Sequence, residues 1–302
     1  MSVLVWVPAP WVSDGVQGVP GADVEIVDPG RQELPDNVAD VEFYVPSFFP
    51  IPESSSVMAQ MPRLKVVQTL TAGVDRLRPF VPPGVILCNA RGAHDASTAE
   101  WVVAAILASV RDFPAFARAT SWDYHPTASL ADSTVLIVGH GSIGKATERR
   151  LAGFEVNVLR VARQARPGVA GLSELPSLLG RADVVVLLVP FTPETAGMVD
   201  ASFLSKMKDG ALLVNAARGP VVDTSALLAE LSSGRLRAAM DVTDPEPLPP
   251  GHPLWTAPGV LITPHVAAST QVSFRRATAL VRSQLESYLS GAPLKNIITD
   301  AY

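Results

Sequence analysis

The chain has 302 residues, of which 48% are hydrophobic and 18% are charged, and its net charge is −5. This length suggests about two domains with large cores, and the composition argues against disorder. No basic tract is present, which argues against nucleic acid as a partner. The apolar run at Val3–Val7 is too short to span a membrane and has no basic leader, so we expect a cytoplasmic protein without membrane contact.

Short apolar runs, separated by Pro, Gly and Asp, fill the first hundred residues. The runs predicted as strands are Val3–Val7, Val24–Val27, Val41–Val45, Leu64–Gln68 and Val85–Cys88. Runs of this kind, interleaved with connecting segments, indicate a parallel sheet. The best helix signal between them is Glu53–Met61. Cys88 is the only cysteine, so a disulfide framework is excluded, and its apolar run predicts a buried reduced thiol.

A long segment at Ser97–Val110 is apolar on every face and predicts a buried helix, as expected for a helix between two sheets. Ser97 or Thr98 could cap this helix. The next strands are predicted at Thr134–Val138, Val156–Val161, Val184–Val189, Ala211–Asn215, Arg237–Asp241 and Val260–Ile262, with helical patterns between several of them, notably Ser225–Ser232. Six strands alternating with helices fit a doubly wound nucleotide-binding sheet.

The predicted amphipathic helix Thr270–Leu289 could carry the chain back to the first domain. We therefore predict an α/β protein with two domains built on parallel sheets. Residues 98–269 would form the dinucleotide-binding domain, inserted into a discontinuous substrate domain made of residues 1–97 and 270–302.

A glycine turn follows the strand Thr134–Val138 and precedes a helix-like segment. Gly139, Gly141 and Gly144 have the Gly-x-Gly-x-x-Gly spacing. These glycines permit a tight turn, a close approach of the backbone to phosphates, and close packing of helix against strand. The helix N-terminus that follows offers N–H groups to an anion, so the turn predicts a dinucleotide pyrophosphate site.

Arginines stand where a dinucleotide-binding strand ends. An NAD-preferring site has Asp or Glu about 20 residues after the glycine turn, where it binds the ribose hydroxyls. This chain has Arg163 there and no acid, with Arg160 and Arg166 close by. Because guanidinium groups attract a 2′-phosphate, we expect the chain to favour NADP(H), with NAD(H) possible.

Three polar residues follow late strands and have complementary chemistry: Arg218, Glu246 and His265. Ligands of open α/β sheets bind outside the carboxyl ends of the strands, so these side chains could converge on one cleft. An arginine can hold a substrate carboxylate, and a histidine can exchange a proton with a carbonyl oxygen. A carboxylate beside the histidine favours its protonated form. This set, beside a nicotinamide, indicates 2-hydroxy acid oxidation or 2-keto acid reduction.

Five segments in the right order resemble successive signatures of the D-isomer-specific 2-hydroxyacid dehydrogenases, and the resemblance covers essentially the whole chain. They are Thr134–Gly144, Leu187–Thr195, Asn215–Asp223, Ala239–Pro247 and Thr263–Thr270. Ala72–Asp75 resembles the family's substrate loop, and Ala292–Asn296 its closing C-terminal segment. The segment from Asp241 to Pro249 is similar to the glyoxylate/hydroxypyruvate reductases.

The resemblance implies two Rossmann-like domains with the substrate between them, and a homodimer formed through the nucleotide domain. It implies Arg218 as substrate anchor, His265 as acid/base and Glu246 as the partner of His265. It also implies that backbone N–H groups of Ala72, Gly73 and Val74 bind the substrate carboxylate. The residues predicted to contact the cofactor are Gly139, His140, Gly141, Ser142, Ile143, Gly144, Arg160, Arg163, Pro190, Thr195, Ala216 and Asp241. No metal site is predicted.

Several residues remain open to more than one interpretation. Arg91 departs from the small residue or proline expected from the family, and could bind a second anionic group of the substrate or pair with Asp95. His94 is expected to be an exposed loop residue, and Asp223 a helix cap. Trp122 and Tyr124 are expected to form packing or dimer contacts, and Phe48 and Phe49 to contribute to substrate specificity.

Two other functions remain compatible with this sequence: a 3-phosphoglycerate dehydrogenase-like enzyme, and a non-catalytic dinucleotide-sensing binding protein of the same fold. The intact set of Arg218, Glu246 and His265 argues against the binding protein without excluding it. A formate dehydrogenase is disfavoured, because Gln would be expected at Glu246.

Overall fold

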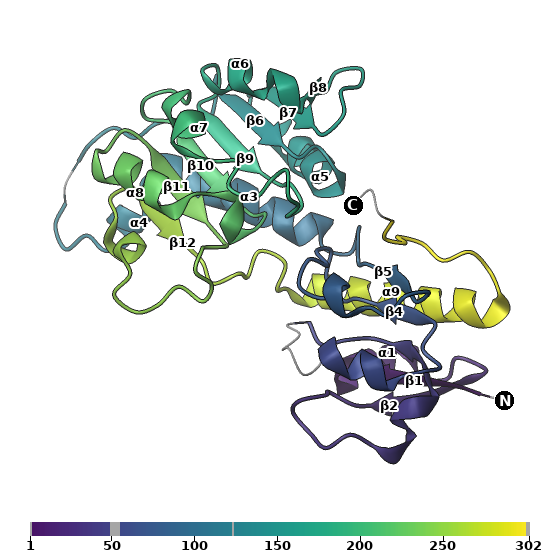
Figure 1. Ribbon diagram of the computed structural model, residues 1–302. Coiled ribbons are helices and arrows are strands. Elements are labelled where there is room, and N and C mark those ends of the chain that lie inside the picture. Colours follow the sequence, from purple (N-terminus) through teal and green to yellow (C-terminus); the bar gives the residue numbers. More distant parts are fainter. Residues whose placement is uncertain (1, 49–54, 123, 300–302) are drawn as a thin grey trace. The chain divides into compact units, whose positions relative to one another are not determined.

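The computed structural model describes residues 2–48, 55–122 and 124–299. The chain divides into two compact units, drawn in Figure 1. Unit 1 consists of Met1–His94 and Gln271–Tyr302, and unit 2 consists of Asp95–Thr270. Unit 2 is thus an insertion in a discontinuous unit 1.

Unit 1 is built on a five-stranded sheet in the order β2-β1-β3-β4-β5, in which every pairing is parallel. Its elements are β1 (Val3–Val7), α1 (Pro10–Val16), β2 (Ala22–Ile26), η1 (Asp36–Asp40), β3 (Val41–Tyr44), η2 (Val57–Gln60), β4 (Val66–Gln68), η3 (Arg78–Phe80), β5 (Ile86–Cys88) and α9 (Gln271–Ser290), where η denotes a 3-10 helix. Helix α9 follows unit 2 in the chain and packs beside α1.

The core of unit 1 lies on both faces of this sheet. On one face, Val5 and Val7 pack with α1 and with Ala277, Val281 and Leu285 of α9. These three positions of α9 are four residues apart, so they form one buried stripe of the helix. The alternate residues of β1 and β3, including Trp6 and Tyr44, pack in a second cluster.

Unit 2 is built on a seven-stranded parallel sheet in the order β12-β11-β10-β9-β6-β7-β8. Its elements are α3 (Asp95–Val110), α4 (Phe113–Phe116), β6 (Thr134–Val138), α5 (Ser142–Leu151), β7 (Asn157–Ala162), β8 (Ala170–Gly171), η4 (Leu172–Glu174), α6 (Leu175–Leu179), β9 (Val184–Leu187), α7 (Ala201–Ser205), β10 (Leu212–Asn215), η5 (Gly219–Val221), α8 (Thr224–Ser232), β11 (Arg237–Met240), η6 (Pro253–Thr256) and β12 (Val260–Ile262). The order reverses beside β6, because β7 and β9 flank it on opposite sides. Such a switch point is where open α/β sheets bind ligands.

Both faces of the unit 2 sheet are covered by helices. Val135 and Ile137 of β6 pack in a cluster with α3 and with Leu151 of α5. Leu136 and Val138 point to the other face and pack with residues of α6, α7 and α8. Burial on both sides explains why these strands read as continuous apolar runs.

The predicted α/β fold with parallel sheets is confirmed, and β1, β6 and β12 have the predicted bounds. Strand β8 and the short helices α1, α4, α6 and α7 were missed, because elements of two to seven residues carry too little periodicity. Residues 53 and 54 of the predicted helix Glu53–Met61 lie outside the described residues, and the remainder contains η2.

Two local predictions can be compared directly with the structure. The capping prediction for α3 was wrong: the helix begins at Asp95, and the Ser97 Oγ is 2.7 Å from the Thr270 Oγ1 instead. The cysteine prediction is confirmed, because Cys88 is free and buried. Burial raises the pKa of the Cys88 thiol to about 11, against a weaker opposing effect of the hydrogen bond with Gln284.

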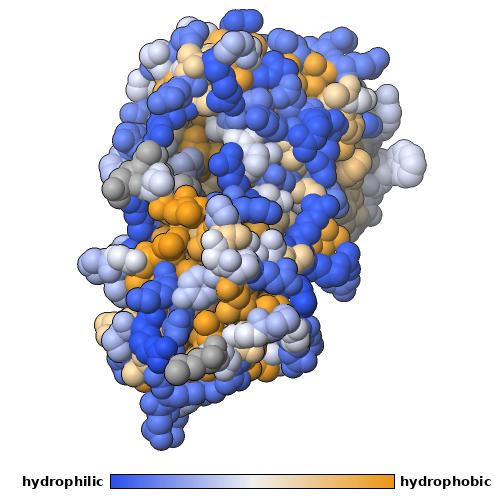
Figure 2. Space-filling view, turned by 90° about the vertical axis from the view of Figure 1, so that its right-hand side faces the viewer, coloured by the Kyte–Doolittle hydropathy of each residue, from blue (hydrophilic) through white to orange (hydrophobic). Residues whose placement is uncertain are grey.

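The face in Figure 2 is largely hydrophilic with smaller apolar areas, as expected when most large apolar side chains lie in the cores. No described helix combines the length and the apolar character needed to cross a membrane.

Candidate active site

The glycine turn lies at the carboxyl end of β6, beside the switch point of the sheet. Gly139 has φ +106°, and a Cβ there would lie 2.5 Å from the carbonyl group of Leu188, so only glycine fits. A Cβ at Gly141 would instead meet no atom within 4 Å. The turn is thus packed against the sheet on one side and open at Gly141, as a phosphate cradle requires.

Helix α5 starts directly after this cradle. Gly141 is its N-cap, and Lys145 donates the first helical hydrogen bond to the Gly141 carbonyl at 3.0 Å. The N–H groups of Ser142, Ile143 and Gly144 belong to the first turn, which lacks helical acceptors. These residues therefore fit the pyrophosphate of a dinucleotide.

Two further loops border this edge of the sheet. In the loop after β9, the Thr195 hydroxyl donates to the Pro190 carbonyl at 2.7 Å and accepts from the Thr192 N–H at 2.9 Å. After β10, the Ala216 N–H donates to the Leu187 carbonyl at 3.3 Å. The structure therefore places Pro190, Thr195 and Ala216 in loops at the carboxyl ends of the strands that follow β6 in the sheet.

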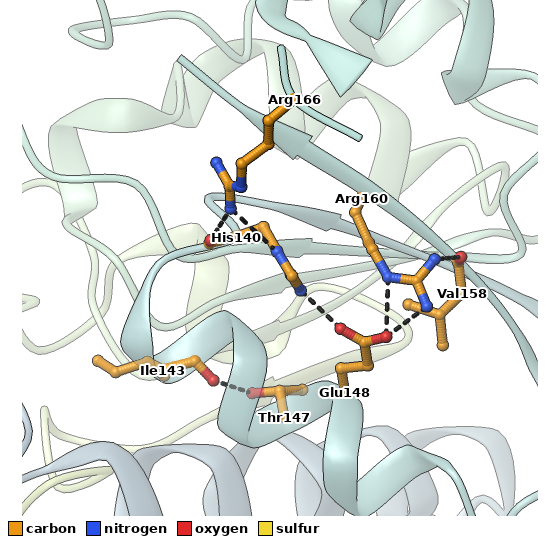
Figure 3. Close-up of polar contacts among 7 residues, drawn as sticks. All are labelled: His140, Ile143, Thr147, Glu148, Val158, Arg160 and Arg166. Carbon is orange, nitrogen blue, oxygen red and sulfur yellow. Dashed lines mark hydrogen bonds and ion pairs between the residues drawn. The ribbon is translucent and has the colours of Figure 1, made fainter. Parts of the chain in front are cut away.

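The three arginines near the end of β7 have different partners. The Arg160 guanidinium bonds the Glu148 carboxylate through two nitrogens and the Val158 carbonyl at 2.9 Å (Figure 3). Arg166 bonds the turn residue His140. The pKa of the Glu194 carboxyl is lowered mainly by the hydrogen bond from the Thr192 hydroxyl, and the charge of Arg163 adds a small effect in the same direction.

His265 and Glu246 form a close pair. The His265 Nδ1 lies 2.5 Å from the Glu246 Oε1, and the two side chains are 29% and 19% exposed. Because a carboxylate accepts, this contact places a proton on Nδ1 and orients the ring. His265 also has φ +56°, which costs energy in a residue other than glycine and is common at functional sites.

Asp241 holds the loop that carries His265. Its carboxylate accepts from the Thr263 hydroxyl at 2.6 Å and from the N–H groups of Val266 and Ala267 at 2.8 and 2.9 Å. The His265 N–H donates to the Asp241 carbonyl at 2.7 Å. The buried Asp241 carboxylate thus supports the histidine loop.

Arg218 is brought toward the same edge by Asn215 and Gly219. The Asn215 side chain donates to the Arg218 carbonyl and accepts from the Ala217 N–H, both at 3.0 Å. A Cβ at Gly219 would lie 1.9 Å from the Thr243 carbonyl oxygen. Glycine therefore lets the Arg218 loop approach the loop that leads to Glu246.

The candidate residues of unit 1 lie in two loops after β4 and β5. The buried Asn89 donates to the Ala72 carbonyl at 2.7 Å and accepts from the Arg91 N–H at 3.1 Å. Among the residues that the structure describes, the N–H groups of Gly73 and Val74 donate no hydrogen bond. These donors are therefore available to an anion.

Other predicted residues are placed as follows. The expectation that His94 is exposed was wrong: it is 3% exposed, its Nε2 lies 2.7 Å from the Leu70 carbonyl, and Phe48 packs edge-on against its ring. Trp122 is 99% exposed, so it makes no packing contact within the described chain.

Asp223 caps α8, as predicted, and accepts from Ser225 and Ala226. Phe49 lies outside the described residues.

Sequence reasoning missed Asn89, Asn215 and Glu148. Each asparagine stands where an apolar strand ends, and an amide side chain can both donate to and accept from backbone groups there. Their positions therefore gave a weak indication of this role. The position of Glu148 gave no such indication, because an acid within a helix is ordinary. In the part of the chain that the structure describes, no group of three or more His, Cys, Asp or Glu side chains is placed to hold a metal ion.

Comparison with known proteins identifies the family. Residues 101–267 match the family described as D-isomer specific 2-hydroxyacid dehydrogenase, NAD binding domain. The glyoxylate reductase of Thermofilum pendens is 34% identical over 281 residues, which cover 87% of this chain and 83% of that protein. The chain belongs to the D-isomer-specific 2-hydroxyacid dehydrogenases. The dehydrogenase is accordingly an NAD(P)-dependent oxidoreductase, and a nicotinamide dinucleotide is its cofactor.

Solved structures of the family match the dehydrogenase over nearly its full length. A D-isomer specific 2-hydroxyacid dehydrogenase from Xanthobacter autotrophicus, in complex with NADPH and MES, has a TM-score of 0.85 at 32% identity and covers 99% of this chain and 98% of its own. An NADPH-dependent glyoxylate/hydroxypyruvate reductase from Sinorhizobium meliloti, in complex with NADP and sulfate, has a TM-score of 0.84 at 29% identity, with coverage of 100% and 99%.

Phosphoglycerate dehydrogenases are also similar to this chain. The D-3-phosphoglycerate dehydrogenase of Mycobacterium tuberculosis is 36% identical over 251 residues, which cover 78% of this chain and 47% of that protein. Family membership therefore leaves the substrate of the dehydrogenase open.

Proposed function

We propose that the dehydrogenase reduces a small 2-keto acid to the D-2-hydroxy acid with NADPH, with glyoxylate and hydroxypyruvate as the first candidates. The contact of His265 with Glu246 carries this proposal, because it pairs a proton donor with a carboxylate at the edge of the sheet where Arg218 also lies. The similarity to glyoxylate reductases supports the choice of substrate.

Each catalytic side chain has a separate task in this reaction. Arg218 binds the substrate carboxylate, which orients the adjacent carbonyl. When bound, the nicotinamide supplies the hydride that reduces the keto carbon. His265 donates a proton to the keto oxygen, which becomes the hydroxyl group. Glu246 stabilises the imidazolium before this transfer and fixes the ring's orientation. In the oxidative direction, His265 accepts the proton.

The preference for NADPH is supported by the residues at the end of β7. Arg163 and Arg166 follow the strand, and no acid is present to bind ribose hydroxyls or repel a phosphate. Arg160, the third candidate, has its guanidinium on Glu148 and Val158. We therefore assign the 2′-phosphate to Arg163 and Arg166. Asp241 is assigned to the His265 loop, because its carboxylate oxygens are used there.

A 2-keto acid with a second anionic group is the alternative substrate class. Asn89 and Asn296 bond the N–H and the carbonyl of Arg91, so the backbone of this residue is held from both sides. Within the described chain, the exposed Arg91 guanidinium has no ion-pair partner. A phosphorylated or dicarboxylic 2-keto acid would supply one.

The decisive experiment is a panel of 2-keto acids assayed with NADPH and NADH. We expect the highest kcat/KM with NADPH and with glyoxylate or hydroxypyruvate. Higher values for phosphohydroxypyruvate or 2-oxoglutarate, lost in Arg91→Ala, would establish the alternative class. A clear preference for NADH would refute the cofactor assignment. Absence of turnover across the panel, with dinucleotide binding intact, would indicate a dinucleotide-sensing protein.

A further inference from the structure

His140 is the residue between the first two glycines of the turn, and it contacts two charged side chains. It is only 7% exposed. Its Nε2 lies 2.6 Å from the Oε2 of Glu148, which belongs to α5. Its Nδ1 lies 3.2 Å from the Nη2 of Arg166, which follows β7 (Figure 3). The ring thus joins the helix after the turn to the segment after the next strand.

The hydrogen-bond donors among these side chains determine which nitrogen of the His140 ring carries the proton. A guanidinium can only donate, so the Nδ1 of His140 accepts from Arg166. The ring proton is then on Nε2, from which it is donated to Glu148. The same Nη2 of Arg166 also donates to the His140 carbonyl at 2.7 Å. The side chain and the backbone of one turn residue therefore both bind Arg166.

Glu148 separates the roles of Arg160 and Arg166. Its second oxygen, Oε1, accepts from two nitrogens of Arg160, whose third nitrogen donates to Val158. The hydrogen bond from Arg160 is the main reason why the pKa of the Glu148 carboxyl is lowered. All three nitrogens of the Arg160 guanidinium therefore donate hydrogen bonds within the protein. In Arg166, the Nε and Nη1 groups make no hydrogen bond to any described residue.

We propose that His140 is a positioning residue for cofactor choice: with Glu148, it holds Arg166 at the glycine turn, where the guanidinium takes the 2′-phosphate of NADP(H). This inference rests on the NADP(H) preference in the proposed function, but not on the identity of the keto acid. The Nη2 of Arg166 fixes the position of the side chain, and its Nε and Nη1 groups remain available to donate to a phosphate. Arg160 is held away from the phosphate by Glu148.

The test measures binding of two cofactor fragments, 2′,5′-ADP and 5′-AMP, by titration calorimetry with the whole protein. These fragments differ in the 2′-phosphate, so the ratio of their dissociation constants reports that group alone. Arg166→Ala should weaken 2′,5′-ADP binding about tenfold to a hundredfold and leave 5′-AMP binding unchanged. His140→Leu should weaken 2′,5′-ADP binding by roughly threefold to tenfold, because the guanidinium keeps its charge but loses its orientation.

Two more variants separate positioning from general damage. His140→Gln, whose amide can accept from Arg166 and donate to Glu148, should recover most of the 2′,5′-ADP affinity. Arg149→Ala removes an exposed arginine of the same helix and should leave the ratio unchanged. In the double variant His140→Leu/Arg166→Ala, we expect no loss beyond that of Arg166→Ala, because the histidine acts through the arginine.

The ratio of kcat/KM for NADPH to kcat/KM for NADH should fall in the same variants that bind 2′,5′-ADP more weakly relative to 5′-AMP. An unchanged fragment ratio in folded His140→Leu would overturn the inference, and so would a larger effect of Arg160→Ala than of Arg166→Ala. Normal selectivity for 2′,5′-ADP without turnover of any 2-keto acid would refute the proposed reaction while leaving the role of His140 intact.

Discussion

Among single residues, His265 is held by several contacts that bear on its proposed role. Its backbone is in the left-handed region, its N–H donates to Asp241, and its ring contacts Glu246. Strain of this kind persists only where surrounding contacts determine the conformation. Asp241 supplies these contacts through the loop from Thr263 to Ala267. The proposed acid/base residue is thus held by contacts within the protein itself.

Replacement of His265 should separate catalysis from binding. His265→Ala should lower kcat by about a hundredfold or more, since a general acid contributes on the order of 10²–10⁴ to a rate. NADPH affinity, measured by fluorescence titration, should change little, because no phosphate-binding residue is altered. Equal losses of kcat and NADPH affinity would instead assign His265 a structural role. The matched control is His125→Ala, an exposed histidine whose Nε2 lies 3.8 Å from an Asp112 carboxylate oxygen.

The predictions from the sequence failed for the partners of single side chains. Arg160 and Arg163 were predicted to contact the cofactor, and Arg166 was named only as a nearby arginine, whereas the structure pairs Arg160 with Glu148. His94, which lies between Gly92 and the polar residue Asp95 in the sequence, gave no sign of burial. In the structure, the partner of Arg160 is 12 residues away in the sequence, that of Arg166 is 26 residues away, and that of His94 is 24 residues away. No local pattern encodes such partners.

At the scale of elements, Asn89 connects the loops that follow β4 and β5. Its side chain bonds the Ala72 carbonyl and the Arg91 N–H, while the Asn296 side chain donates to the carbonyls of Asn89 and Arg91. The C-terminal segment is also tied to β5, because Ile298 donates to the Leu87 carbonyl at 2.8 Å. The C-terminal segment therefore holds the loop after β5, and Asn89 of that loop bonds the predicted substrate loop at Ala72.

Loss of this connection should affect the substrate and not the cofactor. Asn89→Ala should raise KM for the 2-keto acid by roughly threefold to thirtyfold, since each lost hydrogen bond is worth about 1 kcal/mol. KM for NADPH should remain unchanged. Asn157→Ala, at an exposed position of unit 2, serves as the control. An unaltered substrate KM in a folded Asn89→Ala protein would contradict a role for this loop in binding.

The contact between α5 and β7 gives stability a dependence on pH. The hydrogen bonds of Glu148 with Arg160 and His140 lower the pKa of its carboxyl in the folded protein. A lowered folded pKa stabilises the protein above the unfolded pKa of about 4.3, and this contribution is lost as the pH falls through the folded value. Glu148→Gln should therefore cost about 1 kcal/mol at pH 7 and progressively less below about pH 4.

Urea unfolding of both proteins between pH 7 and pH 3.5, followed by circular dichroism, measures this difference. Glu286→Gln removes an exposed ion pair with Arg282 and should change the unfolding midpoint little at any pH. A cost for Glu148→Gln that stays constant down to pH 3.5 would show that the ionised carboxylate is not the stabilising form.

At the scale of the whole molecule, the apolar side chains exposed near α4 bear on assembly. Phe113, Phe116, Trp122 and Tyr124 are all exposed. We expect them to be covered in a homodimer formed through unit 2. Light scattering after size-exclusion chromatography should give twice the mass of one chain, and Phe113→Glu/Phe116→Glu should yield the monomer. The control Trp255→Ser, at another exposed position of unit 2, should stay dimeric. A monomeric parent protein at micromolar concentration would refute this prediction.

The parallel α/β fold, the glycine turn and the family could be predicted from the amino-acid sequence alone, because apolar periodicity and the need for glycine act within a few residues of the chain. The sequence also singled out Arg218, Glu246 and His265 as the chemical set. Which side chains pair is visible only in the three-dimensional arrangement: Glu148 with Arg160, His140 with Arg166, and Asn89 with the loop after β4. The two residues of each pair lie 8 or more residues apart in the chain, so their contact depends on how distant segments fold beside one another, and local patterns carry little information on it.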